Sequence, residues 1–136
     1  MKPVIQQEKS GCAIASSAAI AGITYQKAKA IANSIGIFAD DSSLWSESKY
    51  ICNILKELGF KTSDIEKPFE NWQSLPACAL LAIKWHIKQG KPYWHWAVYV
   101  RKRKEEYILD SSSRLKTNLR TDFGRINPKW SIKVNA

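Results

Sequence analysis

The sequence predicts an α+β fold, in which helices form the N-terminal half and an antiparallel sheet forms the C-terminal half. Helical spacing is clearest before Gly59, where a set of apolar side chains recurs on one face: Leu44, Ile51, Ile54, Leu55 and Leu58. Beyond Gly59 the pattern changes to short apolar or aromatic runs that are typical of strands. Because the two patterns are segregated along the chain and do not alternate, they favour the α+β class.

Two further helices are expected before this one. The first runs from Cys12 to Ala21, with Ser10 supplying the N-cap oxygen and Gly22 ending the helix. Thr24 is expected to cap the second, which runs from Tyr25 to Ser34. A turn and capping cluster, Asp-Asp-Ser-Ser at residues 40–43, separates this pair from the third helix.

The expected strands lie in the second half. The aromatic and β-branched run from Trp94 to Val100 is the best of them, and Glu105 to Asp110 is its hairpin partner. Residues 60–65 and 77–84 are further strands, and residues 130–134 are expected to close the sheet. Loops are expected at residues 68–76, anchored by Phe69 and Trp72, and at residues 111–127.

Length and composition indicate one globular domain spanning residues 1–136. The chain is 45% hydrophobic and 24% charged, which is ordinary for a packed domain. Its most apolar run, residues 13–23, is too short to cross a bilayer and lacks the basic flank and cleavage site of a signal peptide. We therefore expect a cytoplasmic protein without a membrane span.

The formal net charge of +9 raises the question of a polyanionic partner. Most of the basic residues are scattered along the chain. The one run of them, Arg-Lys-Arg-Lys at residues 101–104, is followed by Glu105 and Glu106 between two strand-like segments. A solvated hairpin tip explains this run better than a nucleic-acid site does, so no nucleic-acid partner is expected.

The three cysteines are an odd number, which argues against a disulfide framework, and none has the spacing of a metal site. We therefore expect no cofactor and no metal. Cys12 stands at an expected helix start, where free N–H groups and the helix dipole favour an anion, and the thiolate is the reactive form of cysteine. Cys52 and Cys78 fall within a helix and an apolar strand, as buried structural cysteines do.

A cysteine that attacks acyl groups needs a partner that later protonates the leaving group, usually histidine. His95 lies in the aromatic strand. With a turn centred on residues 102 and 103, it faces Asp110 on the same side of the sheet. A carboxylate there orients the imidazole. His86 has no such partner in the sequence, so His95 is the expected base.

Acyl transfer also needs hydrogen-bond donors for the developing oxyanion. The backbone N–H of Cys12 is one candidate. An upstream side-chain amide is the second, and Gln6 and Gln7 are both available. Gly11, beside the cysteine, leaves room for a substrate backbone to approach.

Three runs of the sequence resemble papain-like cysteine peptidases: QQEKSGCAIAS at residues 6–16, HWAVYV at 95–100 and YILD at 107–110. Within that class the chain is most similar to the bacteriocin-processing group, which removes double-glycine leader peptides. The resemblance covers the whole chain in order. It implies a papain-like fold, with the nucleophile at a helix start packed on a C-terminal antiparallel sheet.

Residue by residue, the resemblance implies that Cys12 is the nucleophile, His95 the general acid and base, Asp110 the orienting residue and Gln6 the oxyanion donor. Members of the family often read Asp-Cys-Gly and Asp-Pro at two of these positions. Here the corresponding residues are Gly-Cys-Ala at 11–13 and Asp-Ser at 110–111, and every catalytic group is kept.

The leading function is therefore a cysteine peptidase that acts on a peptide or protein substrate through a thioester on Cys12. The same Cys–His pair serves papain-like deamidases, transglutaminase-like enzymes and cell-wall amidases, and the sequence does not separate these reactions. A basic domain that binds nucleic acid or an acidic partner is the non-enzymatic alternative, weakened by the dispersal of the six tryptophans. The sequence leaves the oligomeric state open.

Overall fold

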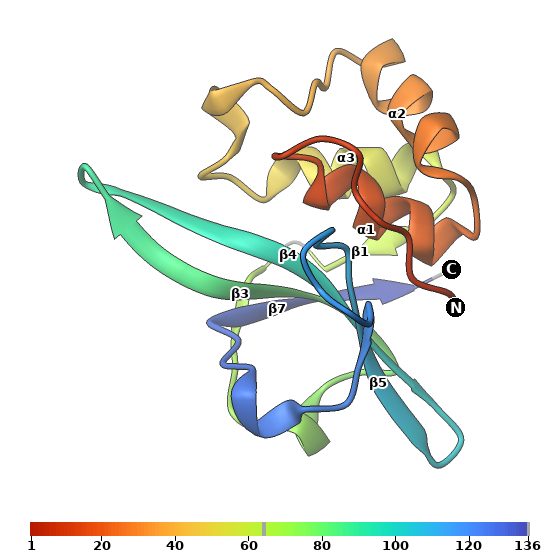
Figure 1. Cartoon of the computed structure of the whole chain (residues 1–136), viewed down its shortest axis with the longest axis vertical. Helices are drawn as coiled ribbons and strands as arrows, with labels where there is room; N and C mark the ends of the chain where they lie inside the picture. Colours follow the sequence, from red (N-terminus) through yellow and green to blue (C-terminus); the bar gives the residue numbers. More distant parts are fainter. Residues whose placement is uncertain (64, 136) are drawn as a thin grey trace.

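The computed structural model describes residues 1–63 and 65–135 and has the expected α+β arrangement (Figure 1). The helices come first: α1 (Cys12–Ala21), α2 (Tyr25–Ser34) and α3 (Lys49–Glu57). The strands follow: β1 (Lys61–Thr62), β2 (Lys67–Pro68), β3 (Cys78–Lys88), β4 (Lys91–Lys102), β5 (Glu105–Asp110), β6 (Leu119–Arg120) and β7 (Trp130–Asn135). In Figure 1 the helices gather on one side of the sheet, with α1 next to it.

The first two helices have the predicted bounds, but their caps differ in part from the prediction. Thr24 caps α2, since its Oγ1 accepts a hydrogen bond from the Lys27 N–H at 3.2 Å. The predicted cap at Ser10 is wrong: Gly11 occupies the N-cap position of α1 and forms no side-chain cap. The Ser10 hydroxyl instead donates to the carbonyl of Ala39 at 2.6 Å, which ties the segment before α1 to the segment after α2.

The third helix begins later than the apolar spacing suggests. Leu44 belongs to a short 3₁₀ turn, Ser42–Leu44, whose start is capped by Asp41 Oδ1 accepting from the Ser43 N–H at 3.1 Å. Gly59 follows α3 with a φ of +92°, which is the left-handed conformation expected of a glycine helix stop.

The order of strands in the sheet is β1-β7-β3-β4-β5-β6, and β2 also pairs with β7. The predicted strand at residues 130–134 is confirmed as β7, but it lies between β1 and β3 rather than at an edge. Of the predicted strand at 60–65 only β1 is present among the described residues, and residue 64 lies outside them. The expected loop at 111–127 contains β6 and a 3₁₀ turn, Phe123–Arg125.

Strands β3 and β4 are longer than the strands predicted at residues 77–84 and 94–100. They form a hairpin that extends beyond the rest of the molecule (Figure 1). Its register shifts between Ile83, which pairs with His95, and His86, which pairs with Tyr93. Two residues on β3 therefore stand opposite one on β4, which is a β-bulge. Lys84, inside the bulge, has a φ of +54°.

The hairpin of β4 and β5 has a different register from the predicted one. Ala97 pairs with Asp110 and Lys102 with Glu105, so the turn lies at residues 103 and 104. The predicted direct pairing of His95 with Asp110 is thus wrong by two residues. Because strand side chains alternate with a period of two, this even shift keeps both side chains on the same face, where they meet diagonally.

Both faces of the sheet are covered. A tryptophan cluster under the helices packs edge to face, with ring centroids 5.0–5.7 Å apart: Trp94, Trp96 and Trp130. The Trp96 indole N–H donates to the Tyr50 hydroxyl at 2.9 Å, which joins the sheet to α3. On the opposite face, the predicted anchors Phe69 and Trp72 pack against the core, with Trp72 stacked on Tyr99. The core therefore fixes the helices on the sheet.

A close contact at Gly11 gives a test of this packing. A Cβ added at Gly11 would overlap the hydroxyl of Tyr25, whose buried ring is held by a 2.7 Å hydrogen bond to Glu8 Oε1. We expect Gly11→Ala to lower the free energy of unfolding by about 1–3 kcal/mol, as overpacking does. Gly124→Ala is the matched control, because a Cβ there meets nothing within 4 Å. Urea denaturation of both variants is the measurement, and equal stabilities would contradict the contact.

Candidate active site

Cys12 is the first residue of α1 and is half-buried. The rest of the helix down to Ile20 is buried between the sheet and the other helices, so the cysteine end is fixed in place. At this end the backbone N–H groups have no partners within the helix, and the helix dipole presents positive charge. The predicted helix-start position of Cys12 is therefore confirmed.

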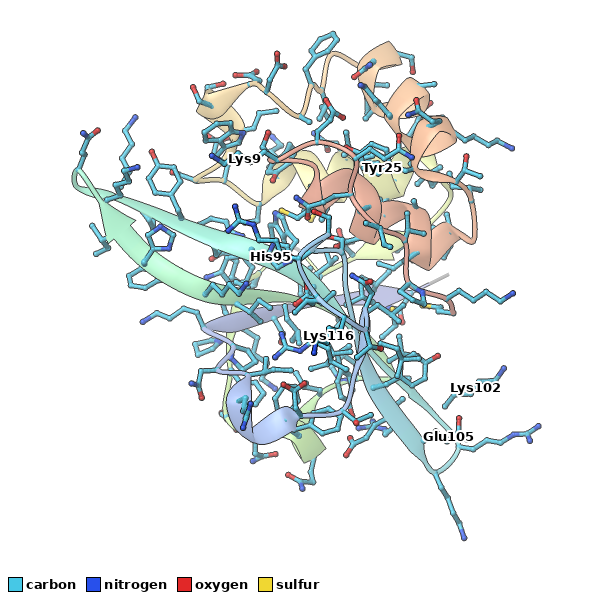
Figure 2. The ribbon with its side chains drawn as sticks, in the orientation of Figure 1. Lys9, Tyr25, His95, Lys102, Glu105 and Lys116 are labelled. Carbon is cyan, nitrogen blue, oxygen red and sulfur yellow. The ribbon has the colours of Figure 1, made fainter. Side chains whose placement is uncertain are left out.

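His95 lies on β4 where the sheet passes beneath the helices, with Lys9 and Tyr25 on the helical side (Figure 2). Its Nε2 lies 2.8 Å from Asp110 Oδ1. The Cys12 side chain is near enough to the ring to help raise the His95 pKa. Because Nε2 is engaged by the carboxylate, Nδ1 is the nitrogen that remains for the thiol. The structure thus brings the three predicted residues together from α1, β4 and β5.

Two members of this cluster, His95 and Asp110, have strongly shifted pKa values. Burial by itself lowers the pKa of His95, but hydrogen bonds to Asp110 and Cys12 and their negative charges outweigh it and raise the pKa to about 9. Burial raises the pKa of Asp110, but the hydrogen bond and charge of His95, with help from Ser112 and Arg120, lower it to about 2. At neutral pH the pair is therefore an imidazolium beside a carboxylate.

Sequence reasoning missed the groups that hold Asp110, whose side chain is fully buried. Arg120 on β6 donates from Nη1 to Asp110 Oδ2 at 3.0 Å, and the Ser112 N–H donates to Oδ1 at 3.1 Å. Asn118 Nδ2 donates to the carbonyls of Asp110 and Ser112 at 2.7 and 2.8 Å. Asp122 holds Arg120 through two hydrogen bonds of 2.8 and 2.9 Å. An Arg-x-Asp pair in a polar segment gave no signal of this role.

Gln6 lies beside the site, but both of its amide hydrogens are in use. Nε2 donates to the backbone carbonyls of Glu8 and Lys9 at 3.0 and 2.9 Å, and Oε1 accepts from the Ser111 hydroxyl at 2.8 Å. The Gln6 N–H also donates to the Ser111 carbonyl at 3.0 Å. Gln6 therefore shapes the turn before Cys12 and ties it to the residue that follows Asp110.

The other candidates lie elsewhere or make other contacts. Gln7 is exposed, and its Oε1 accepts from Gln26 Nε2. His86 is exposed on the β3–β4 hairpin, with Nδ1 2.9 Å from the Lys84 carbonyl. Cys52 and Cys78 are half-buried, on α3 and β3, and burial raises the pKa of the Cys78 thiol to about 11.

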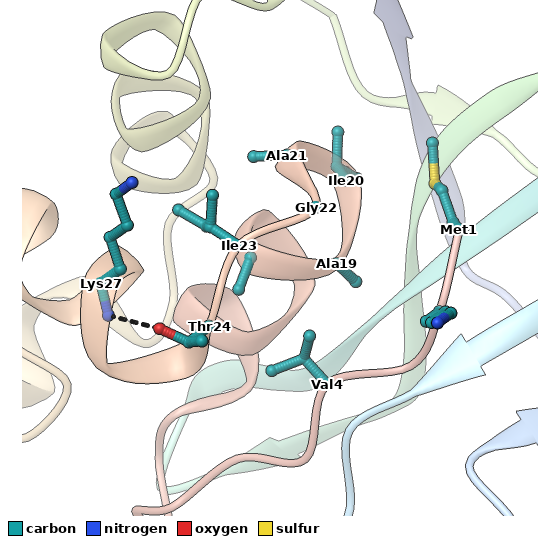
Figure 3. A pocket seen from close by; sticks show the side chains of 11 residues that line it. Met1, Val4, Ala19, Ile20, Ala21, Gly22, Ile23, Thr24 and Lys27 are labelled. Carbon is teal, nitrogen blue, oxygen red and sulfur yellow. Dashed lines mark hydrogen bonds between the residues drawn. The ribbon is translucent and has the colours of Figure 1, made fainter.

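A cleft of about 490 Å³ opens beside His95. Its lining comes from the N-terminal turn, the β-bulge and the segment after Asp110: Gln6, Gln7, Glu8, Lys9, Lys84, His95, Ser112, Ser113 and Arg114. A larger hollow of about 750 Å³ lies at the opposite end of α1, where Thr24 caps α2, and includes none of the catalytic candidates (Figure 3). The cleft, rather than that hollow, is the candidate substrate site.

Residues 1–63 and 65–135 contain neither a metal-binding cluster nor a membrane-crossing helix. No three His, Cys, Asp or Glu side chains in this part of the chain come close enough together to hold a metal ion. None of its helices combines the length and the apolar character needed to span a bilayer.

The pKa values give a test of the His95–Asp110 contact. Because folding raises the His95 pKa from 6.5 to about 9, the pair's contribution to stability is complete below pH 6.5 and is lost as the pH rises through about 9. We expect Asp110→Asn to move the His95 pKa back towards 6.5 and to cost no more than about 3 kcal/mol from this linkage.

NMR titration of the His95 ring, with urea unfolding at pH 6 and pH 10, is the measurement. The stability difference between wild type and Asp110→Asn should be larger at pH 6, and His86→Gln is the control. An unchanged His95 pKa in the Asp110→Asn variant would disprove the interpretation.

Comparisons with known proteins show that the fold of the chain has been seen before. No family model and no curated protein sequence matches the chain. Two solved structures do, each with a TM-score of 0.64 and 16% sequence identity over 98% of this chain. One is a double-glycine-motif protease from an AMS/PCAT transporter in complex with its leader peptide, covered to 91%. The other is the peptidase domain of Streptococcus ComA, a bifunctional ABC transporter of quorum sensing, covered to 96%. The chain therefore has the papain-like fold of the double-glycine peptidase domains.

Proposed function

We propose that the protein is a cysteine peptidase in which Cys12 is the nucleophile, His95 the general acid and base, and Asp110 the residue that orients the imidazole. One observation carries this proposal: the helix-start thiol and the carboxylate-held imidazole meet across the two halves of a peptidase fold. Each partner alone has an ordinary structural explanation, whereas the three together form the arrangement that acyl transfer needs.

The reaction follows from the charges of the site. The Cys12 thiolate attacks the substrate carbonyl carbon, and the carbonyl π electrons move to the oxygen. When the intermediate collapses, the C–N bond breaks and the His95 imidazolium gives its proton to the leaving amine, which leaves a thioester. Neutral His95 then takes a proton from water as the water attacks the thioester. Release of the acid restores the thiolate and imidazolium. A His95 pKa near 9 supports an imidazolium at neutral pH.

The oxyanion requires donors, and two are near Cys12. The Cys12 N–H stands at the helix start without an intrahelical partner. The second donor is Gln6, whose Nε2 must exchange one of its two backbone carbonyl partners for the substrate oxygen. The negative charge that develops on the substrate oxygen is expected to drive this exchange, because a charge-assisted hydrogen bond is stronger than a neutral one.

The substrate is a peptide or protein. A structural neighbour holds a leader peptide, and double-glycine peptides are accordingly the first probes for this chain. The papain-like deamidases and amidases use the same Cys–His pair, and their products differ. New peptide termini identify the peptidase reaction, whereas ammonia without chain cleavage identifies a deamidase.

The nucleophile is tested by labelling with a peptide that ends in a thiol-reactive group after Gly-Gly. We expect wild type to be labelled at one site and Cys12→Ala to be unlabelled with its unfolding curve retained, because Cys12 is half-buried and its side chain is small. Cys52→Ala and Cys78→Ala are matched controls that keep labelling. Intact-mass and peptide-mapping mass spectrometry read the result. Label remaining on a Cys12→Ala protein would refute the assignment.

The oxyanion donor is tested with Gln6→Ala, with the exposed Gln7→Ala as its neighbour control. Loss of one such donor lowers kcat by on the order of 10²–10³. We expect that loss for Gln6→Ala with little change in KM, measured on the best cleaved peptide of a library. Equal kcat values for both variants would assign Gln6 to the turn alone.

A further inference from the structure

The cleft beside His95 carries an excess of positive charge that the triad does not explain. Three of its lining residues are basic: Lys9, Lys84 and Arg114. All three are exposed, and within residues 1–63 and 65–135 none of them forms an ion pair. They come from the turn before Cys12, from β3 and from the segment after Asp110, so three separate segments contribute positive charge to the cleft that His95 lines.

The one acidic residue of the lining is already neutralised. Glu8 Oε1 accepts the Tyr25 hydroxyl hydrogen at 2.7 Å and lies 3.3 Å from Lys29 Nζ, which is outside the lining. The buried Asp110 carboxylate is likewise matched by His95 and Arg120. Both carboxylates near the cleft therefore have cations of their own, and Lys9, Lys84 and Arg114 remain uncompensated.

Lys84 reaches this cleft through a local backbone irregularity. It belongs to the β-bulge that follows the Ile83–His95 pair and has a φ of +54°, a conformation that costs energy for a residue other than glycine. Bulges next to sites of reaction commonly redirect a side chain. In a regular strand the Lys84 side chain would follow the alternation of its neighbours on β3. With the bulge, Lys84 lines the same cleft as His95.

We propose that this cationic cleft selects substrates with an acidic side chain close to the reacting carbonyl, and that Lys84 and Arg114 bind that carboxylate. The proposal rests on the proposed peptidase function and adds the substrate class. An Arg beside a Lys suits a carboxylate, because the guanidinium donates two parallel hydrogen bonds and the ammonium adds a point charge. The cleft volume, about 490 Å³, fits a short peptide segment better than a folded or duplex polyanion.

A pair of small alkylating reagents tests the charge of the cleft without a known substrate. With both iodoacetate and iodoacetamide, the Cys12 thiolate attacks the CH₂ carbon and iodide leaves. The two reagents differ by one negative charge, which only iodoacetate carries. We expect the ratio of the iodoacetate rate to the iodoacetamide rate at Cys12 to fall about tenfold in the double variant Lys84→Asn/Arg114→Met at low salt, because two positive charges that attract the anionic reagent are removed. Asn is chosen at position 84 because it tolerates a positive φ.

Lys88→Asn/Lys102→Met is the matched control, with the same loss of charge at exposed positions outside the cleft. His95 contributes equally to the ratio in every variant, so the comparison isolates the cleft lysine and arginine. Added salt should reduce the wild-type ratio, because exposed charges are screened. A ratio that falls equally in both double variants, or in neither, overturns the proposal. Iodoacetamide that reacts no faster at Cys12 than at Cys52 and Cys78 rejects the peptidase function instead.

A peptide pair then tests the substrate class directly. Cys12→Ala protein is titrated with fluorescent Glu-Glu-Gly-Gly-Ser and Gln-Gln-Gly-Gly-Ser and their reversed sequences, which place the acid on either side of the glycines. We expect a glutamate peptide to bind at least fivefold more tightly than its glutamine twin, and the difference to vanish in Lys84→Asn/Arg114→Met. Equal binding of the twins overturns the proposal. Single-stranded DNA that displaces the fluorescent glutamate peptide at a lower concentration than the unlabelled glutamate peptide does also overturns the proposal, in favour of a nucleic-acid ligand.

Discussion

The contact between His95 and Asp110 is the interaction on which the rest of the site depends. It places a fully buried carboxylate against an imidazole, and a buried charge without partners would cost several kcal/mol. The chain satisfies that carboxylate from three directions: β4 supplies His95, β6 supplies Arg120, and the turn after β5 supplies the Ser112 N–H. The segment between β5 and β6 is therefore folded around the charge, although it is polar and contains few apolar anchors.

The thiol half of the site is brought into register by a second set of hydrogen bonds. Gln6 forms a backbone and a side-chain hydrogen bond with Ser111, the residue next to Asp110. The same amide holds the carbonyls of Glu8 and Lys9, and the turn leads directly into α1. A single side chain thus connects the segment that carries the sulfur with the strand that carries the carboxylate. Proximity of this kind, set before substrate arrives, is a large part of what an active site contributes to rate.

The predictable parts of this molecule were those that depend on local pattern. The helix bounds of α1 and α2, the strand of His95 and the positions of Cys12, His95 and Asp110 all follow from spacing, capping and residue type. The turn between β4 and β5 was misplaced because an Arg-Lys-Arg-Lys run contains no glycine or asparagine to mark the left-handed position, which Arg103 takes with a φ of +59°. The cap at Ser10 failed because Gly11, and not Ser10, directly precedes the first helical residue and occupies the N-cap position.

The supporting groups were not predictable, since each depends on a non-local pairing. Arg120 reaches Asp110 only because β6 pairs with β5, and two-residue strands leave no recognisable pattern. The bulge at Lys84 likewise leaves no pattern in the sequence, because a shift in register is a property of two paired strands and not of one. Sequence reasoning therefore identified the reacting groups and missed what orients and surrounds them.

The place of β7 in the sheet has a consequence for how the protein is made. β7 follows every other strand in sequence, yet it is the central connector between β1, β2 and β3. Until the ribosome has released it, β3 presents an unpaired apolar edge, the stretch from Ala79 to Leu81 that β7 will cover. From the time β3 emerges until β7 has followed it, the nascent chain therefore exposes this apolar edge. The sheet is completed only by a long-range pairing, which is intrinsically slow.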